Sequence, residues 1–299
     1  MPIFYIFVFM NYECLICQVK SLLTRLEKFD IPEDERDHIV AEILNDISKI
    51  DLSKSYSPEI TSNILDHLKK YSEVEDPYYE EKYSINHQML KRYSEFRDKV
   101  SSSENPFDTA MRLAIAGNII DYGPSQIFDL EGTLNRVINA DFAIDHSEIL
   151  KSRIEQANTI LYLGDNCGEI VLDKLFLETI SHPNVWFAVR DKPVLNDVTT
   201  KEAEDVGIKE VAHIISNGDD APSTLLNRVS PAFMKIYNSA DLIISKGMGN
   251  YEGLMFEDDP RIFFLLMVKC SVISDKISAA KGEFVVKHNW NGVNKNVKA

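Results

Sequence analysis

The second half of this chain alternates short apolar runs with segments of helical periodicity. The apolar runs are Ile160–Leu163, Val185–Val189, Val211–Ile215, Leu242–Ile244 and Phe263–Val268. The helical segments between them include Ile170–Ile180, Lys201–Asp205 and Ser230–Asn238. Strands that are apolar on both faces and separated by helices are typical of a mostly parallel sheet covered on both sides. The sequence therefore predicts a three-layer α/β/α sandwich, with Glu283–Lys287 as a last edge strand.

The first half of the chain has a different, helical pattern. Apolar residues recur there at spacings of three or four, as at Ile39, Ile43 and Ile47. Few runs with strand composition interrupt this pattern. We therefore expect a mainly helical N-terminal region over residues 10–152, followed by an α/β domain that binds metal and phosphate over residues 153–290.

Composition narrows the class of protein. Of 299 residues, 44% are hydrophobic and 26% are charged, which is typical of a soluble globular chain. The formal net charge of -15 argues against a general nucleic-acid binder, which needs a basic face. A small phosphorylated substrate remains compatible with this charge, because a metal ion supplies local positive charge. The four cysteines form no disulfide framework, so we expect a reducing, cytoplasmic compartment.

The start of the chain includes an apolar run from Pro2 to Met10. This run is far shorter than the roughly 20 residues that cross a bilayer. It also lacks the basic start and the cleavage site of a secretory signal. We expect translation to begin at Met10; a short strand or a membrane-surface anchor is the alternative interpretation.

Polar clusters follow four of the predicted strands. The first is Gly-Asp-Asn-Cys-Gly-Glu at residues 164–169, and the others are residues 190–199, 216–224 and 245–252. The carboxyl ends of parallel strands meet at one edge of a sheet, where helix N-termini open toward ligands. A single Asp or Asn after a strand is explained equally well by helix capping or a turn. Four such clusters together indicate a functional site.

The side chains in these clusters suit metal-assisted phosphate chemistry. Hard divalent ions such as Mg²⁺ and Mn²⁺ prefer carboxylate and amide oxygens as ligands. Phosphoryl transfer also needs cationic and N–H donors around the phosphate oxygens. The sequence contains neither a Gly-x-Ser-x-Gly elbow nor a Gly-x-x-x-x-Gly-Lys-Ser/Thr loop. A metal-dependent phosphatase is therefore favoured over a serine or thiol hydrolase.

Three ordered motifs in these clusters resemble one known family. They are Gly-Asp-Asn-x-Gly-Glu, then Arg-x-x-Pro-x-x-Asn-Asp-x-Thr, then Lys-Gly-x-x-Asn-Tyr-Glu. Together they resemble the metal-dependent damage-control phosphatases, first described as domain of unknown function 89 and also called acidic-residue-methyltransferase-like. The early Cys14-Leu15-Ile16-Cys17 and the segment from Arg112 to Gly123 are similar to its small prokaryotic, archaeal-type branch. The resemblance covers roughly Met10 to His288.

This resemblance implies an N-terminal helical region packed on a Rossmann-like α/β domain. It also implies one divalent ion (Mg²⁺, Mn²⁺, Co²⁺ or Ni²⁺) in a site whose residues have matching positions here. The matching metal ligands are Asp165, Asn166 and Asp197. The matching residues on the phosphate side are Lys246 and Asn250, with Arg190, Asn196 and Glu169 as helpers. Catalytic roles are expected for Asp165, Lys246 and Glu169.

Two departures from the family pattern fall where the choice of substrate is expected to be made. Asp191 stands where a small residue is usual, and the third cluster has Gly-Asp-Asp-Ala-Pro-Ser at residues 218–223. The substrate of this chain is therefore not inferred from the natural substrates of its relatives.

The helical half offers two further candidates for the substrate pocket. Asn118 and Asp121 are three positions apart (i and i+3), which places them on one face of a helix. They either close the pocket from the helical side or form a buried hydrogen-bonded pair.

The cysteines carry weaker signals. Cys14 and Cys17 supply half of a zinc site, and no second pair completes it. They are either packed structural thiols or have a family-specific role near the site. Cys167, inside the first motif, is expected to be a tolerated small residue rather than a nucleophile.

We therefore expect a metal-dependent phosphatase that acts on small phosphorylated metabolites, such as sugar phosphates or related damaged metabolites. Its attacking group is either a water molecule or a carboxylate such as that of Asp165. One alternative is an S-adenosylmethionine-dependent carboxyl methyltransferase, because a strand that ends in Leu-Gly-Asp resembles a cofactor loop. Another is a non-catalytic module that binds a phosphorylated ligand. The sequence does not determine the substrate, the preferred metal or the oligomeric state.

Overall fold

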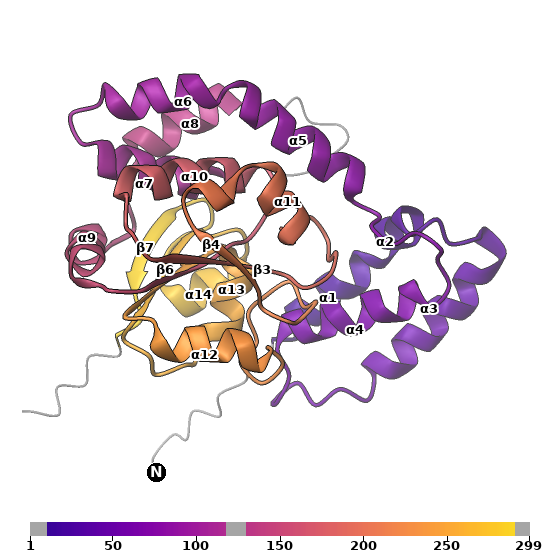
Figure 1. Ribbon diagram of the computed structural model, residues 1–299. Coiled ribbons are helices and arrows are strands. Elements are labelled where there is room, and N and C mark those ends of the chain that lie inside the picture. The colour runs from indigo at the N-terminus through magenta and orange to yellow at the C-terminus, as the bar shows by residue number, and fades with distance from the viewer. Residues whose placement is uncertain (1–10, 118–129, 291–299) are drawn as a thin grey trace, which may run out of the picture.

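A single sheet lies at the centre of the computed structural model, which describes residues 11–117 and 130–290 (Figure 1). In these residues it has seven strands in the order β1-β7-β6-β5-β2-β3-β4. The strands are β1 (Ile144–Asp145), β2 (Ile160–Leu163), β3 (Val185–Val189), β4 (His213–Ser216), β5 (Leu242–Lys246), β6 (Ile262–Met267) and β7 (Phe284–His288). Neighbours are parallel except β6 and β7, which are antiparallel. The predicted mostly parallel sheet is confirmed.

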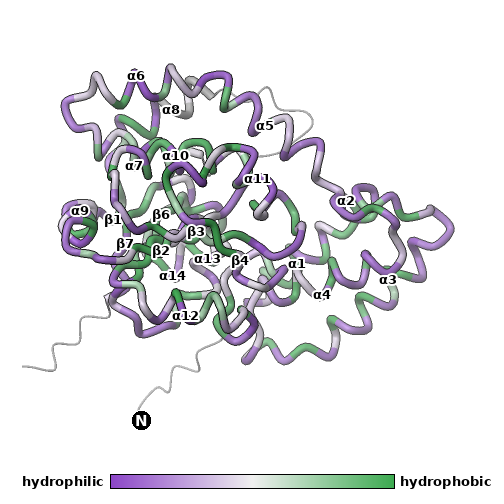
Figure 2. Tube along the Cα trace, viewed as in Figure 1, coloured by the Kyte–Doolittle hydropathy of each residue, from purple (hydrophilic) through white to green (hydrophobic). Residues whose placement is uncertain are grey.

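Helices cover both faces of this sheet (Figure 1). One face packs against α7 (Pro106–Ala116) and α10 (Glu169–Ile180), and the other packs against α12 (Pro231–Ser239), α13 (Gly247–Leu254) and α14 (Ser271–Ile277). Alternate residues of a strand point to opposite faces, so β2 contributes Tyr162 to the first core and Leu161 to the second. Figure 2 shows the strands mainly in green and outer helices such as α3 and α6 largely in purple. The predicted three-layer sandwich is confirmed.

The first half of the chain is helical, as predicted. Its helices are α1 (Tyr12–Lys20), α2 (Leu22–Lys28), α3 (Glu33–Ile47), α4 (Ser57–Lys69), α5 (Tyr79–Lys91), α6 (Tyr93–Ser101), α7 and α8 (Leu130–Asn139). Helices α2, α3 and α4 share a separate apolar core, which also receives Val194 from the loop after β3. This lobe lies beside the sandwich, on the right of Figure 1. The division at residues 152 and 153 stays a prediction; it falls within α9 (Ser147–Gln156), after β1 has joined the sheet.

Four predicted strands have different bounds in the structure: β6 and β7 are shifted by one residue, and β4 and β5 differ more. The expectation that residues 283–287 form an edge strand is wrong, because β7 lies between β1 and β6. The strand expected at Val211–Ile215 begins only at His213, because the N–H groups of Val211 and Ala212 both donate to the carbonyl of Ile208 in a preceding turn. The strand expected at Leu242–Ile244 continues through Lys246. This extension decides the environment of Lys246, because it makes that residue part of the buried sheet.

The strand order reverses between β2 and β5, which are adjacent although they are far apart in the chain. Ligands of open parallel sheets bind outside the carboxyl ends of the strands at such a reversal. Leu163 pairs with Ser245 at this point. The segments that follow, from Gly164 and from Lys246, therefore form the walls of the expected site.

Within residues 11–117 and 130–290, no helix is both long enough and apolar enough to span a membrane. The apolar run at the start of the chain and the proposed start at Met10 lie outside the described residues.

Candidate metal and phosphate site

The loops after β2 and β3 lie against each other at the reversal of strand order. Asn166 and Asp197 form an isolated antiparallel bridge. Beside it, the N–H of Cys167 donates to the carbonyl oxygen of Asn196 at 2.9 Å, and the carbonyl of Asp165 accepts from the loop after β3. Backbone hydrogen bonds thus bring together the three residues predicted to hold the metal.

The polar side chains of the first loop face one another rather than solvent. The Nδ2 of Asn166 donates to Oδ2 of Asp165 at 2.7 Å and lies 3.5 Å from Oε2 of Glu169. Glu169 is completely buried at the first position of α10, and Asp165 is 7% exposed. Gly168, just before this helix, has a φ of 79°, a conformation that glycine adopts without strain.

Arg190 lies at the centre of the site and is 2% exposed. Its Nε donates to Oδ2 of Asp197 at 2.7 Å, and its Nη2 lies 3.9 Å from Oδ1 of Asp165. The same Nη2 donates to Oδ1 of Asn250 at 3.1 Å. One guanidinium group therefore connects the segments that follow β2, β3 and β5.

Asn250 is completely buried in α13 and uses its whole amide group. Its Nδ2 donates to the carbonyl oxygens of Gly164 at 3.0 Å and Lys246 at 2.9 Å. Its Oδ1 also accepts from Oγ1 of Thr224, at 2.9 Å, at the end of the third polar cluster. Asn250 therefore ties the loop after β2 to the end of β5, while its predicted contact with phosphate stays a prediction.

Lys246 is the last residue of β5 and points to the same face as Ile244, toward α7 and α10. Its Nζ donates to the carbonyl oxygen of Ala114 at 2.8 Å, to Oε1 of Glu169 at 2.5 Å and to Oδ1 of Asp173 at 2.6 Å. Burial by itself lowers the pKa of Lys246, but the two carboxylates outweigh burial and raise it to about 12. The completely buried ammonium is thus charged and fully engaged, and its predicted phosphate contact stays a prediction.

The donor set fits one hard divalent ion. Burial raises the pKa of both Asp165 and Asp197, Glu169 raises both further, and the charge of Arg190 opposes the increase. The single positive charge of Arg190 does not balance two buried carboxylates, so a further cation would be bound favourably here. In the described ranges, no three His, Cys, Asp or Glu side chains form a ready ligand group, so the predicted set depends on the amide of Asn166. One or two carboxylates, with positions left for water and phosphate, are typical of Mg²⁺.

The unusual third loop is bound to the N-terminal helices. Oδ1 of Asp219 accepts from Nε of Arg228 at 2.9 Å. Asp220 accepts from Nη2 of Arg228 and from Nζ of Lys69 on α4, both at 3.3 Å. The Nη2 of Arg228 also donates to Ser62 on α4, at 3.0 Å. Both aspartates of this departure therefore form ion pairs, and the pair of Asp220 with Lys69 joins α4 to the rim of the site.

The other departure, Asp191, lies at the same rim. Its Oδ1 accepts from Oγ of Ser216 at 2.7 Å, and its N–H donates to the carbonyl oxygen of Asp219 at 3.0 Å. Its exposed side chain therefore fixes the ends of β3 and β4 relative to each other. The predicted pocket residues Asn118 and Asp121 lie outside the described residues.

The three cysteines that lie in sequence motifs differ in their exposure. Cys14 is partly buried, Cys17 is exposed and Cys167 is completely buried. Burial raises the pKa of Cys14 to about 11 and also raises the pKa of Cys167, which disfavours the nucleophilic thiolate at both positions. The two interpretations of the Cys14 and Cys17 pair stay open.

A comparison with known families identifies the family of this chain. The family model described as "Damage-control phosphatase ARMT1-like domain" matches residues 10–285 of this chain. The chain belongs to this family. The resemblance carried by the three motifs is confirmed, and the matched range agrees with the expected extent of roughly Met10 to His288.

Two archaeal relatives match almost the whole length of this chain. A damage-control phosphatase of Pyrococcus horikoshii is 31% identical over 93% of this chain and 98% of its own. An uncharacterized protein of Methanocaldococcus jannaschii is 33% identical over 92% of this chain and 93% of its own. The crystal structure of a DUF89 family protein from Pyrococcus horikoshii matches with a TM-score of 0.85 and 29% identity, over 94% of this chain and 99% of that chain.

Three further residues lie close to the proposed site, and the sequence motifs did not predict them. Lys269 lies two residues beyond the end of β6, and its charge acts on Asp165 in the direction that lowers the pKa of that carboxyl. Its position after a predicted strand was an available signal. Asp173, which accepts from Tyr162 at 2.7 Å, and Asn86 of α5 gave no such signal, because each lies within a helix.

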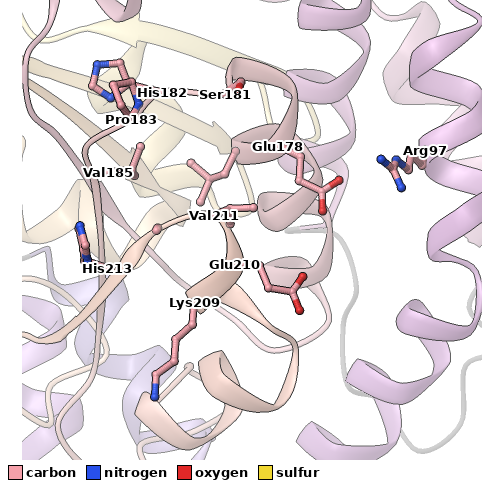
Figure 3. Close-up of a pocket in the computed structure, with 12 residues that line it drawn as sticks. Arg97, Glu178, Ser181, His182, Pro183, Val185, Lys209, Glu210, Val211 and His213 are labelled. Carbon is pink, nitrogen blue, oxygen red and sulfur yellow. The ribbon is translucent and has the colours of Figure 1, made fainter.

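A groove of about 580 Å³ lies at the opposite edge of the sheet, at the amino ends of β3 and β4 (Figure 3). It is lined by Arg97, Leu177, Glu178, Ser181, His182, Pro183, Val185, Lys209, Glu210, Val211, Ala212 and His213. Lys209 pairs with Glu204 and Glu210 pairs with Lys174, each at 2.7 Å. None of the predicted site residues that the structure describes lines this groove, so we assign it no role in phosphate chemistry.

Proposed function

We propose that this member of the damage-control phosphatase family is a cytoplasmic, metal-dependent phosphomonoester hydrolase of small phosphorylated metabolites. The observation that supports this proposal most directly is the convergence of Asp165, Asn166 and Asp197 at the reversal of strand order, with Arg190 between the two carboxylates. Relatives named damage-control phosphatases support the same activity.

In the proposed site, Asp165, Asn166 and Asp197 hold one divalent ion. When bound, this ion supplies a Lewis acid that neutralises charge on the phosphoryl oxygens. Arg190 orients the carboxylate of Asp197, and its cationic Nη2 lies near Asp165.

Several other groups support the proposed chemistry. Asn250 holds Arg190 in place, and Lys269 contributes a second positive charge close to Asp165. Lys246 acts through the buried carboxylate of Glu169, which lies next to Asn166. Asn118 and Asp121 remain proposed substrate contacts.

Phosphate release from p-nitrophenyl phosphate and a panel of sugar phosphates tests the proposal, with Mg²⁺, Mn²⁺, Co²⁺ and Ni²⁺ each added to metal-free protein. Asp165→Asn and Asp197→Asn are expected to lose at least about 100-fold in rate, because the loss of a group that only orients a metal ligand already costs about 10- to 100-fold. Asp205→Asn is a matched control, because this exposed carboxylate lies on α11 (Thr200–Asp205). Full activity of both site variants, or hydrolysis without any metal, would contradict the assignment.

The methyltransferase alternative is not favoured, because the relatives with functional names are phosphatases. Calorimetric titration with S-adenosylmethionine separates the two activities. The non-catalytic alternative is tested by the same phosphate-release panel, since a pure binding module releases no phosphate with any metal.

A further inference from the structure

Two side chains of α5 reach across to the two loops that carry the proposed metal ligands. Lys82 and Asn86 are four residues apart and therefore lie on the same face of the helix. Lys82 is completely buried and Asn86 is 4% exposed, although most of the residues between and around them on α5 face solvent. A lysine and an amide at buried positions of a surface helix need partners, because unpaired buried polar groups are costly.

Asn86 binds the first loop at its tightest point. Its Oδ1 accepts from the backbone N–H of Gly168 at 2.5 Å. Its side chain also forms a hydrogen bond with the buried thiol of Cys167. Gly168 has the positive φ that turns the chain from Asn166 into α10. The amide of Asn86 therefore fixes the turn that connects Asp165 and Asn166 to α10.

Lys82 acts on the second loop through one carboxylate. Its Nζ lies 2.9 Å from Oε1 of Glu202 and 2.6 Å from Oδ2 of Asp76. The other oxygen of Glu202 accepts from the N–H of Thr199 at 2.9 Å and from its Oγ1 at 2.5 Å. Thr199 is two residues beyond Asp197 and forms a backbone bridge with Arg190. The second ligand-bearing loop is thus held by the same helix face.

We infer that α5 sets the spacing between the two ligand-bearing loops, with Asn86 as a positioning residue for the metal site. This inference rests on the proposed function, because it concerns the metal held by Asp165, Asn166 and Asp197. Residues beyond the direct ligands commonly control metal affinity by orienting them, and their loss costs about 10- to 100-fold in affinity. Here Asn86 of the N-terminal helical region orients the ligands indirectly, because its Oδ1 accepts a hydrogen bond from the backbone N–H of Gly168.

The test compares Mn²⁺ binding by calorimetry in three variants and the wild-type chain. Asn86→Leu removes the acceptor at nearly constant size, and Asn86→Asp keeps an acceptor for the Gly168 N–H. Gln88→Leu is the matched control, because Gln88 is an exposed amide on the same helix that donates to Oγ of Ser84 at 3.0 Å. We expect the Mn²⁺ Kd to rise at least about tenfold in Asn86→Leu, to recover largely in Asn86→Asp and to stay unchanged in Gln88→Leu.

A second measurement keeps the inference testable if Asn86→Leu does not fold. Hydrogen exchange of the wild-type Gly168 amide is expected to be strongly protected, because its acceptor is buried in α5. An unprotected Gly168 amide, or an unchanged Mn²⁺ Kd in a folded Asn86→Leu, would overturn the inference and leave the proposed function intact. A wild-type chain that binds no Mn²⁺ would overturn the proposed metal role and this inference with it.

Discussion

The Nε of Arg190 lies 2.7 Å from Oδ2 of Asp197, and both side chains are almost completely buried. Removing one partner of a buried ion pair typically costs about 3–5 kcal/mol, because the other charge is left without compensation. We expect Arg190→Met to destabilise the metal-free chain by about this amount. Thermal unfolding with and without Mn²⁺ checks this, since a bound cation should recover part of the loss. Equal losses in both conditions would show that Arg190 does not share the carboxylates with a metal.

The buried cluster beneath the site makes a second prediction. Lys246→Met leaves Glu169 and Asp173 buried without their cation, so its expected cost is also about 3–5 kcal/mol. Adding Asp173→Asn should restore part of this stability, because it removes one of the two stranded charges. Urea unfolding of the two single variants and the double variant measures this coupling. Strictly additive losses would mean that Lys246 and Asp173 do not act as a pair.

Metal binding is expected to depend on pH. Burial, followed by the nearby carboxylate of Glu169, raises the pKa of Asp165, and burial also raises that of Asp197. Raised values mean that protons compete with the metal, so affinity should increase as pH rises. For each proton released, the Kd should fall about tenfold per pH unit below the pKa and level off above it. Titrations in buffers of different ionisation enthalpy count the protons. A Kd that does not increase as the pH is lowered through the range in which the chain stays folded would contradict the prediction.

The partly buried carboxyl of Glu252, at the end of the fourth polar cluster, gives a pH-dependent prediction for stability. Burial raises the folded-state pKa of Glu252 from 4.5 to about 7, while Lys276 opposes the increase. The folded chain thus binds this proton more tightly than the unfolded chain does. The contribution of Glu252 to stability falls between pH 4.5 and about 7 and is constant above that range.

Glu252→Gln should therefore raise the unfolding temperature at about pH 8 and change it little at about pH 4. The exposed Glu155→Gln on α9 is the control, and it should have little effect at either pH. A gain that is the same at both pH values would show that the ionisation of Glu252 is not its cause.

Much of the α/β half could be predicted from local pattern alone. The bounds of β2 and β3 agree with their apolar runs, since strands buried on both faces have no polar residue until they end. The same feature predicted where Asp165, Asn166 and Asp197 would meet, because parallel strands end at one edge. Where the apolar run stopped early, at Ile244, the strand nevertheless continued to Lys246.

The sequence by itself thus determined the layers of the fold and the polar loops that meet at the reversal of strand order. Only the tertiary structure decided that Lys246 is buried among three acceptors, because that depends on which face of β5 meets α7 and α10. It alone also brought Asn86 to Gly168, 82 residues later in the chain. Periodicity reports which side of a helix is buried, but it carries no information on the distant backbone group that the buried side chain will contact.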